Sequence, residues 1–173
     1  MSDRSELIEL HNRLSKTLDE ERGAAREKRY EKGYRTAREN LDDLVDKDSF
    51  VEYGQLAIAA QKSRRELEEL RTETAADGII TGFGKINSEI LDDKKALSAI
   101  IINDYSVLAG TQGYYHHKKL DRICETAEKQ NLPVVMYTEG GGGRPGDTDV
   151  HVQFAGLNIP SFSNWAKLRG KSI

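Results

Sequence analysis

The segment from residue 96 to residue 137 carries the pattern that most limits what this chain can fold into. Residues 96–103 (ALSAIIIN) are almost continuously apolar, which is typical of a strand buried on both faces of a sheet. Residues 113–131 show helical periodicity, and residues 134–137 (VVMY) form a second short apolar run. Strand, helix and strand in this order predict a right-handed crossover between parallel strands. We therefore expect an α/β fold, with the next loop at the carboxyl edge where open sheets bind ligands.

That loop contains four consecutive glycines, Gly140–Gly143, and leads into Arg144. Glycine loses more backbone freedom on ordering than any other residue, so an ordered run of four is unfavourable by itself. One interpretation is a flexible turn. Another is an anion site, because successive backbone N–H groups without side chains can surround a developing negative charge such as an enolate oxygen. The glycines alone leave both interpretations open.

The same loop formally matches a dinucleotide-binding pattern. Gly141, Gly143 and Gly146 have the spacing G-x-G-x-x-G, but in a run of glycines this match is weak, and Pro145 lies inside it. Only residues 147–173 follow, too few for the strand and the acidic residue that normally come next. Nucleotide binding is therefore a disfavoured third hypothesis, which thermal stabilisation by NAD but not by CoA would support.

The two parts of the chain differ in composition. Residues 1–75 are dominated by charge and helical spacing, whereas residues 76–173 hold most of the β-branched residues and glycines, so we predict a division there. An apolar stripe runs along the otherwise charged N-terminal arm and needs a partner surface; it consists of Leu7, Leu10, Leu14 and Leu18. The arm can pack on its own domain, which is the favoured interpretation, or on another chain.

Three more elements are expected from local patterns. Thr36 and Glu39 have the spacing of a capping box, which predicts the start of a short helix with an apolar face at Leu41 and Leu44. Residues 61–73 (QKSRRELEELRTE) predict a surface helix, and residues 78–86 (GIITGFGKI) predict a strand with two interior glycines.

Few side chains have the spacing of a catalytic or metal site. His116 and His117 are neighbours on the expected helix and point about 100° apart, so we expect one to pack and the other to be solvated. His11 and His151 have no partner at ligand spacing. Cys124, the single cysteine, excludes an internal disulfide and is expected to be a small core residue rather than a nucleophile. We expect no metal site.

Charge and hydropathy exclude other classes of protein. The formal net charge is −3, which disfavours a nucleic-acid binder. The sequence contains no run of about 18 apolar residues that would span a membrane. Its charged N-terminus is unlike a secretory signal, so we expect a cytoplasmic protein.

Five motifs in order resemble a known family: RTARENLDDLVDKDSFVEYG, DGIITGFGKIN, INDYSVLAGTQGYYHHKKL, NLPVVMYTEGGGGR and IPSFS. Over roughly residues 33–165 the chain resembles the N-terminal part of the carboxyltransferase subunit (beta chain) of biotin-dependent acyl-CoA carboxylases, such as acetyl-CoA and propionyl-CoA carboxylase. Related acyl-CoA decarboxylases share the pattern. The resemblance implies a partial crotonase-like (ClpP/crotonase) domain with parallel strands and crossover helices, preceded by a helical N-terminal arm.

The resemblance implies a specific chemistry. A carboxyl group would pass between carboxybiotin and the α-carbon of an acyl-CoA thioester, through an enolate held by backbone amides. Gly141 and Gly142 would supply the donors of an oxyanion hole, Gly143 would keep the turn tight, and Arg144 would orient the loop. Gly110 matches a family glycine at the entrance to the following helix and is grouped with Gly143 and Arg144 as substrate-binding.

Two other details follow from the resemblance. Lys118 and Lys119 match a basic position, where a contact with a CoA phosphate is one interpretation and an ordinary solvated face is the favoured one. The family usually has Asp-Ser where this chain has Glu139 and Gly140, so the hydrogen bonds that anchor the loop are expected to differ.

The family continues into a second glycine loop and a biotin-binding half, whereas this sequence ends at Ile173. We therefore expect a truncated or split component, inactive alone, that works as a homo-oligomer with further carboxyltransferase segments and a biotin carboxyl carrier or biotin carboxylase. Biotin would be attached to that carrier, and acyl-CoA would be the substrate. The alternative is a non-enzymatic CoA-binding or assembly module of a carboxylase or decarboxylase complex, docked through the arm 3–32.

Overall fold

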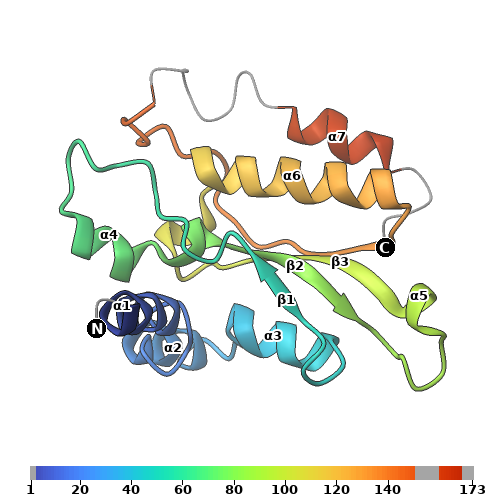
Figure 1. Cartoon of the computed structure of the whole chain (residues 1–173). Coiled ribbons are helices and arrows are strands. Elements are labelled where there is room, and N and C mark those ends of the chain that lie inside the picture. Colours follow the sequence, from blue (N-terminus) through green and yellow to red (C-terminus); the bar gives the residue numbers. More distant parts are fainter. Residues whose placement is uncertain (1–2, 151–159, 169–173) are drawn as a thin grey trace.

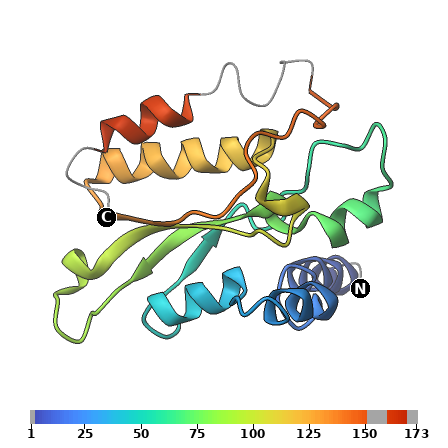
Figure 2. The ribbon, with the colours of Figure 1, turned by 180° about the vertical axis from the view of Figure 1, so that it is seen from behind.

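The computed structural model describes residues 3–150 and 160–168. A four-stranded sheet lies between two helical layers (Figures 1 and 2), with α6 and α7 on one side and α1, α2 and α3 on the other. The elements in chain order are α1 (Asp3–Ser15), α2 (Gly23–Tyr30), α3 (Ala37–Leu44), β1 (Val51–Tyr53), α4 (Leu67–Glu73), η1 (Ala75–Gly78), β2 (Ile79–Lys85), α5 (Asp93–Ala96), β3 (Leu97–Asn103), η2 (Leu108–Gly110), α6 (Tyr114–Gln130), β4 (Val134–Tyr137) and α7 (Ser161–Lys167).

The sheet is mixed, with strand order β1-β2-β3-β4. β3 and β4 are parallel and joined by α6, which confirms the predicted crossover. The other two pairs are antiparallel, so the expectation of parallel strands throughout was wrong for β2 and β3. Residues 86–96, which connect them, are too short for a crossover of a dozen or more residues, and the chain turns back as a hairpin.

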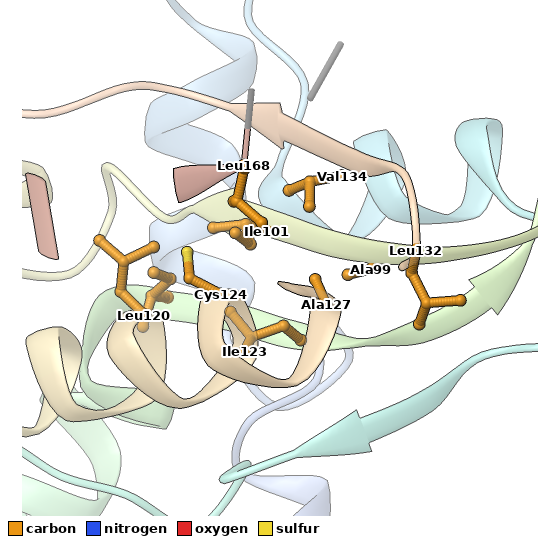
Figure 3. Close-up of a cluster of buried hydrophobic side chains, with 10 residues drawn as sticks. Ala99, Ile101, Leu120, Ile123, Cys124, Ala127, Leu132, Val134 and Leu168 are labelled. Atoms are coloured by element: carbon orange, nitrogen blue, oxygen red, sulfur yellow. The ribbon is translucent and has the colours of Figure 1, made fainter. Parts of the chain in front are cut away.

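β3 is buried on both faces, as its continuous apolar run predicts. Ile101 faces α6 and belongs to a cluster with Ile123 and Ala127 of that helix (Figure 3). Ile100 and Ile102 face the opposite way and pack in a second cluster that includes Leu41 of α3 and Ile80 of β2. Burial of each isoleucine stabilises the fold by about 1.5–3 kcal/mol. Two covered faces therefore fix β3 as the centre of the sheet.

α6 follows the predicted helix closely. Gly113 is its N-cap, and Asn131 ends it in the left-handed conformation (φ 56°). His116, Leu120, Ile123 and Ala127, which recur at helical spacing, are buried on one side of α6, and Cys124 beside them is 1% exposed. Burial raises the pKa of the Cys124 thiol to about 11, which agrees with a core residue rather than a nucleophile.

The N-terminal helices show one confirmed and one corrected prediction. The capping box is present: Thr36 Oγ1 accepts from Glu39 N at 3.0 Å, and Thr36 N donates to Glu39 Oε2 at 2.7 Å. The helix predicted over 61–73 is shorter, since α4 begins at residue 67. The amides of Lys62 and Ser63 instead donate to the Asp149 carboxylate at 2.7 Å each, which holds this segment as a turn.

The arm contacts its own domain mainly through charged groups. Arg22 donates to Asp104 (2.6 Å) and Ser106 (2.9 Å) beyond the end of β3. The leucine stripe remains largely exposed, with Leu7 at 52% and Leu10 at 40%. The division at residue 75 stays a prediction; β1, from the first part, pairs with β2.

No helix within the described ranges is both long and apolar enough to cross a membrane.

Candidate functional site

A cavity of about 780 Å³ lies between the N-terminal arm and the ends of β3 and β4. Its walls come from α2, from the turn after β3, from the end of α4 and from the start of the glycine loop. The lining residues are Glu21, Arg22, Gly23, Ala24, Ala25, Lys28, Arg29, Lys32, Tyr34, Thr72, Glu73, Tyr105, Ser106, Ala109 and Glu139. The loop predicted to bind a ligand therefore begins at the wall of a real cavity.

The cavity wall combines cationic and aromatic side chains with three glutamates, of which Glu139 is paired with Arg29. Arg22 is already paired with Asp104. Burial raises the pKa of the Asp104 carboxyl, but the charge of Arg22 and the hydrogen bonds from Ser106 and Arg22 together outweigh burial and lower that pKa. Lys28 and Lys32 are exposed, and their ammonium groups have no hydrogen bond or ion pair within the part of the chain that the structure describes. Two free ammonium groups beside two tyrosines (Tyr34 and Tyr105) can attract a ligand that carries phosphate and an aromatic ring.

Arg29 is the most constrained side chain of this wall. Nη1 and Nη2 donate to the two carboxylate oxygens of Glu139 at 2.7 and 2.9 Å, and Nε donates to the carbonyl of Arg35 at 2.9 Å. The guanidinium also lies 5.2 Å from the ring centre of Tyr34 and 5.9 Å from that of Tyr105. Arg29 thus joins α2 to the first residue of the glycine loop.

The glycine loop packs against the turn after β3. Gly110 has φ +66°, and a Cβ on it would lie 2.7 Å from both the carbonyl oxygen of Glu139 and Cα of Gly140. Leu108 and Ala109 also have positive φ (48° and 55°), so three left-handed residues in succession bring this turn to the loop. This close approach explains why a side chain is absent at Gly110 and Gly140.

The far part of the loop is held by a ladder with the residue before α6. Gln112 N donates to the carbonyl of Gly142 at 2.8 Å, and Arg144 N donates to the carbonyl of Gln112 at 2.8 Å. Gly143 bridges to Gln112 as in a parallel sheet. Gly141 and Gly142 are exposed, and their amides have no hydrogen-bond partner among the described residues. These two N–H groups are free to meet a ligand, and their role stays a prediction.

Arg144 is buried (5% exposed) at the end of the loop. Nε and Nη2 donate to Asp147 at 2.8 and 3.1 Å, Nη1 donates to the carbonyl of Thr111 at 3.1 Å, and Nη2 also pairs with Asp77. Burial raises the pKa of Asp77 to about 6, and the attraction of Arg144 offsets only part of this effect. Every nitrogen of the guanidinium is engaged inside the protein, and its role in orienting the loop stays a prediction.

The expectation that Lys119 lies on a solvated face was wrong. Lys119 is 4% exposed, and its ammonium group donates to the carbonyls of Ala76 (2.8 Å) and Ile79. These carbonyls flank the left-handed turn at Ala76 and Asp77 (φ 52° and 50°), so the lysine stabilises a strained backbone. Lys118 is exposed, as expected.

The expectation of one packed and one solvated histidine was also wrong, because both are buried (His116 at 0%, His117 at 7%). Nδ1 of His116 lies 3.2 Å from the carbonyl of Asp77, and Nδ1 of His117 lies 3.1 Å from Oγ of Ser161 on α7. α7 packs against α6 at this point and so buries His117. His11 is exposed, and His151 lies outside the described residues. The described residues contain no cluster of side chains that could hold a metal.

Sequence reasoning missed Arg29, Asp77 and Asp147. A turn-forming Asp-Gly pair marks Asp77, but no local signal connects it to Arg144. Arg29 stands in a helix rich in charge, where nothing distinguishes it from Lys28 or Arg26.

Residues 28–158 match the carboxyl transferase domain family. The chain belongs to this family. The match includes the glycine loop, Arg29 and most of the cavity wall, whereas the wall residues 21–25 precede the matched range.

Curated relatives support the same assignment. The chain is 34% identical over 139 residues to the beta5 subunit of a biotin-dependent acetyl-/propionyl-coenzyme A carboxylase of Mycobacterium leprae, which covers 80% of this chain and 23% of the relative. It is 30% identical to the propionyl-CoA carboxylase beta chain of Roseobacter denitrificans (73% and 24%). A 30% match to the methylmalonyl-CoA decarboxylase subunit alpha of Veillonella parvula covers 78% and 25%. The chain thus spans about a quarter of the length of these relatives.

Solved structures have the same fold. A single-chain, multi-domain long-chain acyl-CoA carboxylase matches with TM-score 0.89 and 50% identity, over 96% of this chain and 16% of that protein. The 12S transcarboxylase, a hexamer with methylmalonyl-coenzyme A bound, matches with TM-score 0.58 and 26% identity, over 84% and 24%. The mixed α/β fold described above is therefore that of part of a carboxyltransferase.

Proposed function

We propose that this chain is an acyl-CoA carboxyltransferase component that supplies one part of an active site completed by further segments or subunits. The observation that carries the proposal is the glycine loop, with two unpartnered amides, beginning at the wall of a cationic and aromatic cavity in a carboxyl transferase domain. The finer fold, a partial crotonase-like domain, belongs to the same proposal.

The cavity is the proposed site of the CoA nucleotide. Lys28 and Lys32 contact its phosphates, because Arg22 and Arg29 are already paired with carboxylates. Tyr34 and Tyr105 offer ring faces to the adenine. Glu139 lies in this wall and directly precedes Gly140, so the thioester end of a ligand in the cavity would lie near the glycine loop.

The amides of Gly141 and Gly142 are the proposed donors to the thioester oxygen. When a base of the completed active site removes the proton of the α-carbon, negative charge moves to this oxygen, and fixed N–H donors about 2.7–3.1 Å away stabilise it. Gly110 and Gly143 give the loop its shape, and Arg144 orients it from below. Biotin on a partner carrier supplies the carboxyl group, so this chain needs no cofactor attachment site of its own.

The length of the relatives indicates which partners this chain is expected to need. The chain spans about a quarter of their length, and so the biotin site and the other half of the acyl-CoA site come from further carboxyltransferase segments, within a homo-oligomer. We expect the chain alone to bind acyl-CoA and to transfer no carboxyl group to a biotin analogue. Substantial turnover by the chain alone would contradict the half-site proposal.

The direct test measures CoA affinity by isothermal titration at low and high salt. Replacing Lys28 and Lys32 together by alanine should weaken binding about tenfold at low salt and less at high salt, since these contacts are ionic. The matched control is Lys94→Ala, which removes an exposed lysine of α5 that does not line the cavity and should leave affinity unchanged. Equal affinity of all three proteins would rule out the proposed CoA site.

The alternative function, a non-enzymatic CoA-binding or assembly module, is favoured by one observation: the leucine stripe of α1 is left exposed. This alternative requires a stable complex through the arm and no contribution to catalysis. If the chain binds CoA but adds no carboxyl transfer when combined with the remaining carboxyltransferase segments, the module is the correct function.

A further inference from the structure

We propose that Arg29 and Glu139 are a positioning pair that fixes the glycine loop, so that helix α2 of the N-terminal arm is a working part of the acyl-CoA site. This inference rests on the proposed function for its catalytic consequence. Its structural part, the fixing of the loop by α2, can be tested without any ligand.

The contact between the two side chains is specific. Two parallel hydrogen bonds of 2.7 and 2.9 Å join the guanidinium to both carboxylate oxygens, and the third nitrogen is held by the carbonyl of Arg35. The side chain of Arg29 is 11% exposed and that of Glu139 is 35% exposed, so water screens the pair from one side. A fork-to-fork pair of this kind fixes orientation as well as distance.

The loop has few anchors of its own, because only its far part is held by backbone hydrogen bonds, those between Gly142, Arg144 and Gln112. Gly140–Gly143 have no side chains, and their backbone would sample many conformations if only the chain ends held it. Arg144 anchors the far end through buried bonds to Asp77 and Asp147. Glu139 is the residue at the near end, and Arg29 is its partner. The four glycines therefore lie between two arginine–carboxylate clamps.

The clamp at Glu139 also controls the approach of the two backbones. The carbonyl of Glu139 lies close enough to Gly110 that a Cβ there would clash with it at 2.7 Å. Release of the Glu139 side chain would let this contact open and the amides of Gly141 and Gly142 turn. Hydrogen-bond donors stabilise a developing charge only when they are already in place. A mobile loop should therefore lower the rate of catalysis more than the affinity for the substrate.

Three variants and a control test the pair in this chain. Glu139→Gln keeps the shape and removes the charge; Arg29→Lys keeps the charge and removes the fork. The double variant completes a mutant cycle. The control is Glu52→Gln, because Glu52 accepts two hydrogen bonds from Arg38 (2.5 and 3.1 Å) in the same fork geometry away from the loop.

The first measurement is ¹⁵N relaxation of Gly140–Gly143 without ligand. In the parent chain and in Glu52→Gln we expect order parameters of rigid backbone, about 0.8 or higher, and in both single variants a fall toward about 0.6. The double variant should be no more mobile than either single variant. Loop glycines that are mobile in the parent chain, or equally rigid in Glu139→Gln, would overturn the positioning pair.

The second measurement is the carbonyl band of ¹³C-labelled acetyl-CoA thioester bound to each protein, in isotope-edited infrared spectra. Binding to the parent chain should shift the band, and Glu139→Gln should lose about half of the shift or more while CoA affinity changes less than about threefold. An undiminished shift would overturn the catalytic consequence. Failure of the parent chain to bind acyl-CoA would overturn the proposed function, whereas the relaxation data would still decide on the clamp.

Discussion

Asp77 and Arg144 form a buried ion pair although 67 residues separate them in the sequence. The pair connects the left-handed turn before β2 to the end of the glycine loop, and the same guanidinium binds Asp147. One side chain therefore fixes three segments that meet at the carboxyl edge of the sheet. The stability of this edge, and not only its shape, should depend on Arg144.

Replacing Arg144 by methionine should destabilise the protein by about 3–5 kcal/mol, because it leaves two buried carboxylates without a partner. Urea unfolding followed by circular dichroism measures the change. Lys85→Met is the control, since it removes an exposed pair with Asp93 and should cost about 1 kcal/mol or less. A loss below about 1 kcal/mol for Arg144→Met would show that the pair contributes little.

Acid should destabilise the protein through His116. Burial, together with the charge of the neighbouring His117, lowers the pKa of this imidazole to about 3, whereas the unfolded chain takes up the proton near 6.5. Between these values the unfolded state binds more protons, so stability falls as pH falls, by about 1.4 kcal/mol per pH unit. From pH 6.5 to pH 4.5 the loss should reach about 2–3 kcal/mol.

His116→Leu removes this titration and serves as the reference. The free energy of unfolding of the parent chain relative to this variant should decrease as pH is lowered from 6.5 to 4.5. Parallel pH profiles of the two proteins would mean that His116 takes up its proton at the same pH in the folded and the unfolded state, which would contradict the lowered pKa.

Gly110→Ala should be far more harmful than Gly33→Ala, although both glycines have similar positive φ values (+66° and +75°). An added Cβ meets nothing within 4 Å at Gly33, so only backbone strain of about 1 kcal/mol is expected there. At Gly110 it meets the backbone of Glu139 and Gly140, which should add about 1–3 kcal/mol. Thermal unfolding of both variants checks this, and equal melting temperatures would contradict the close approach.

Lys119→Met should destabilise the protein by about 2 kcal/mol or more, because two buried carbonyls at the turn before β2 lose their donor. Lys118→Met changes the exposed neighbour on the same helix and should alter stability by less than about 0.5 kcal/mol. Both substitutions replace lysine by methionine on α6, so comparing their chemical unfolding separates the effect of burial on stability from the effect of helix propensity. Similar stabilities would be inconsistent with the hydrogen bonds described for Lys119.

The sequence by itself determined the elements whose signals are local. The continuous apolar run of β3, the periodicity of α6, the short run of β4 and the Thr36–Glu39 capping box all predicted what the structure contains. The motifs likewise pointed to the family to which the chain belongs. These predictions succeed because hydrophobic spacing and capping act over a few residues, within the reach of a local pattern.

Only the tertiary structure decided which distant groups meet. The antiparallel pairing of β2 with β3, the burial of His117 and Lys119, and the contact of Arg29 with Glu139 across 110 residues have no local signature. The local sequence around a charged helical residue does not show whether its side chain faces water or a carboxylate, because segments far away in the chain form its environment. The sequence therefore located the glycine loop, whereas packing determined what holds it in place.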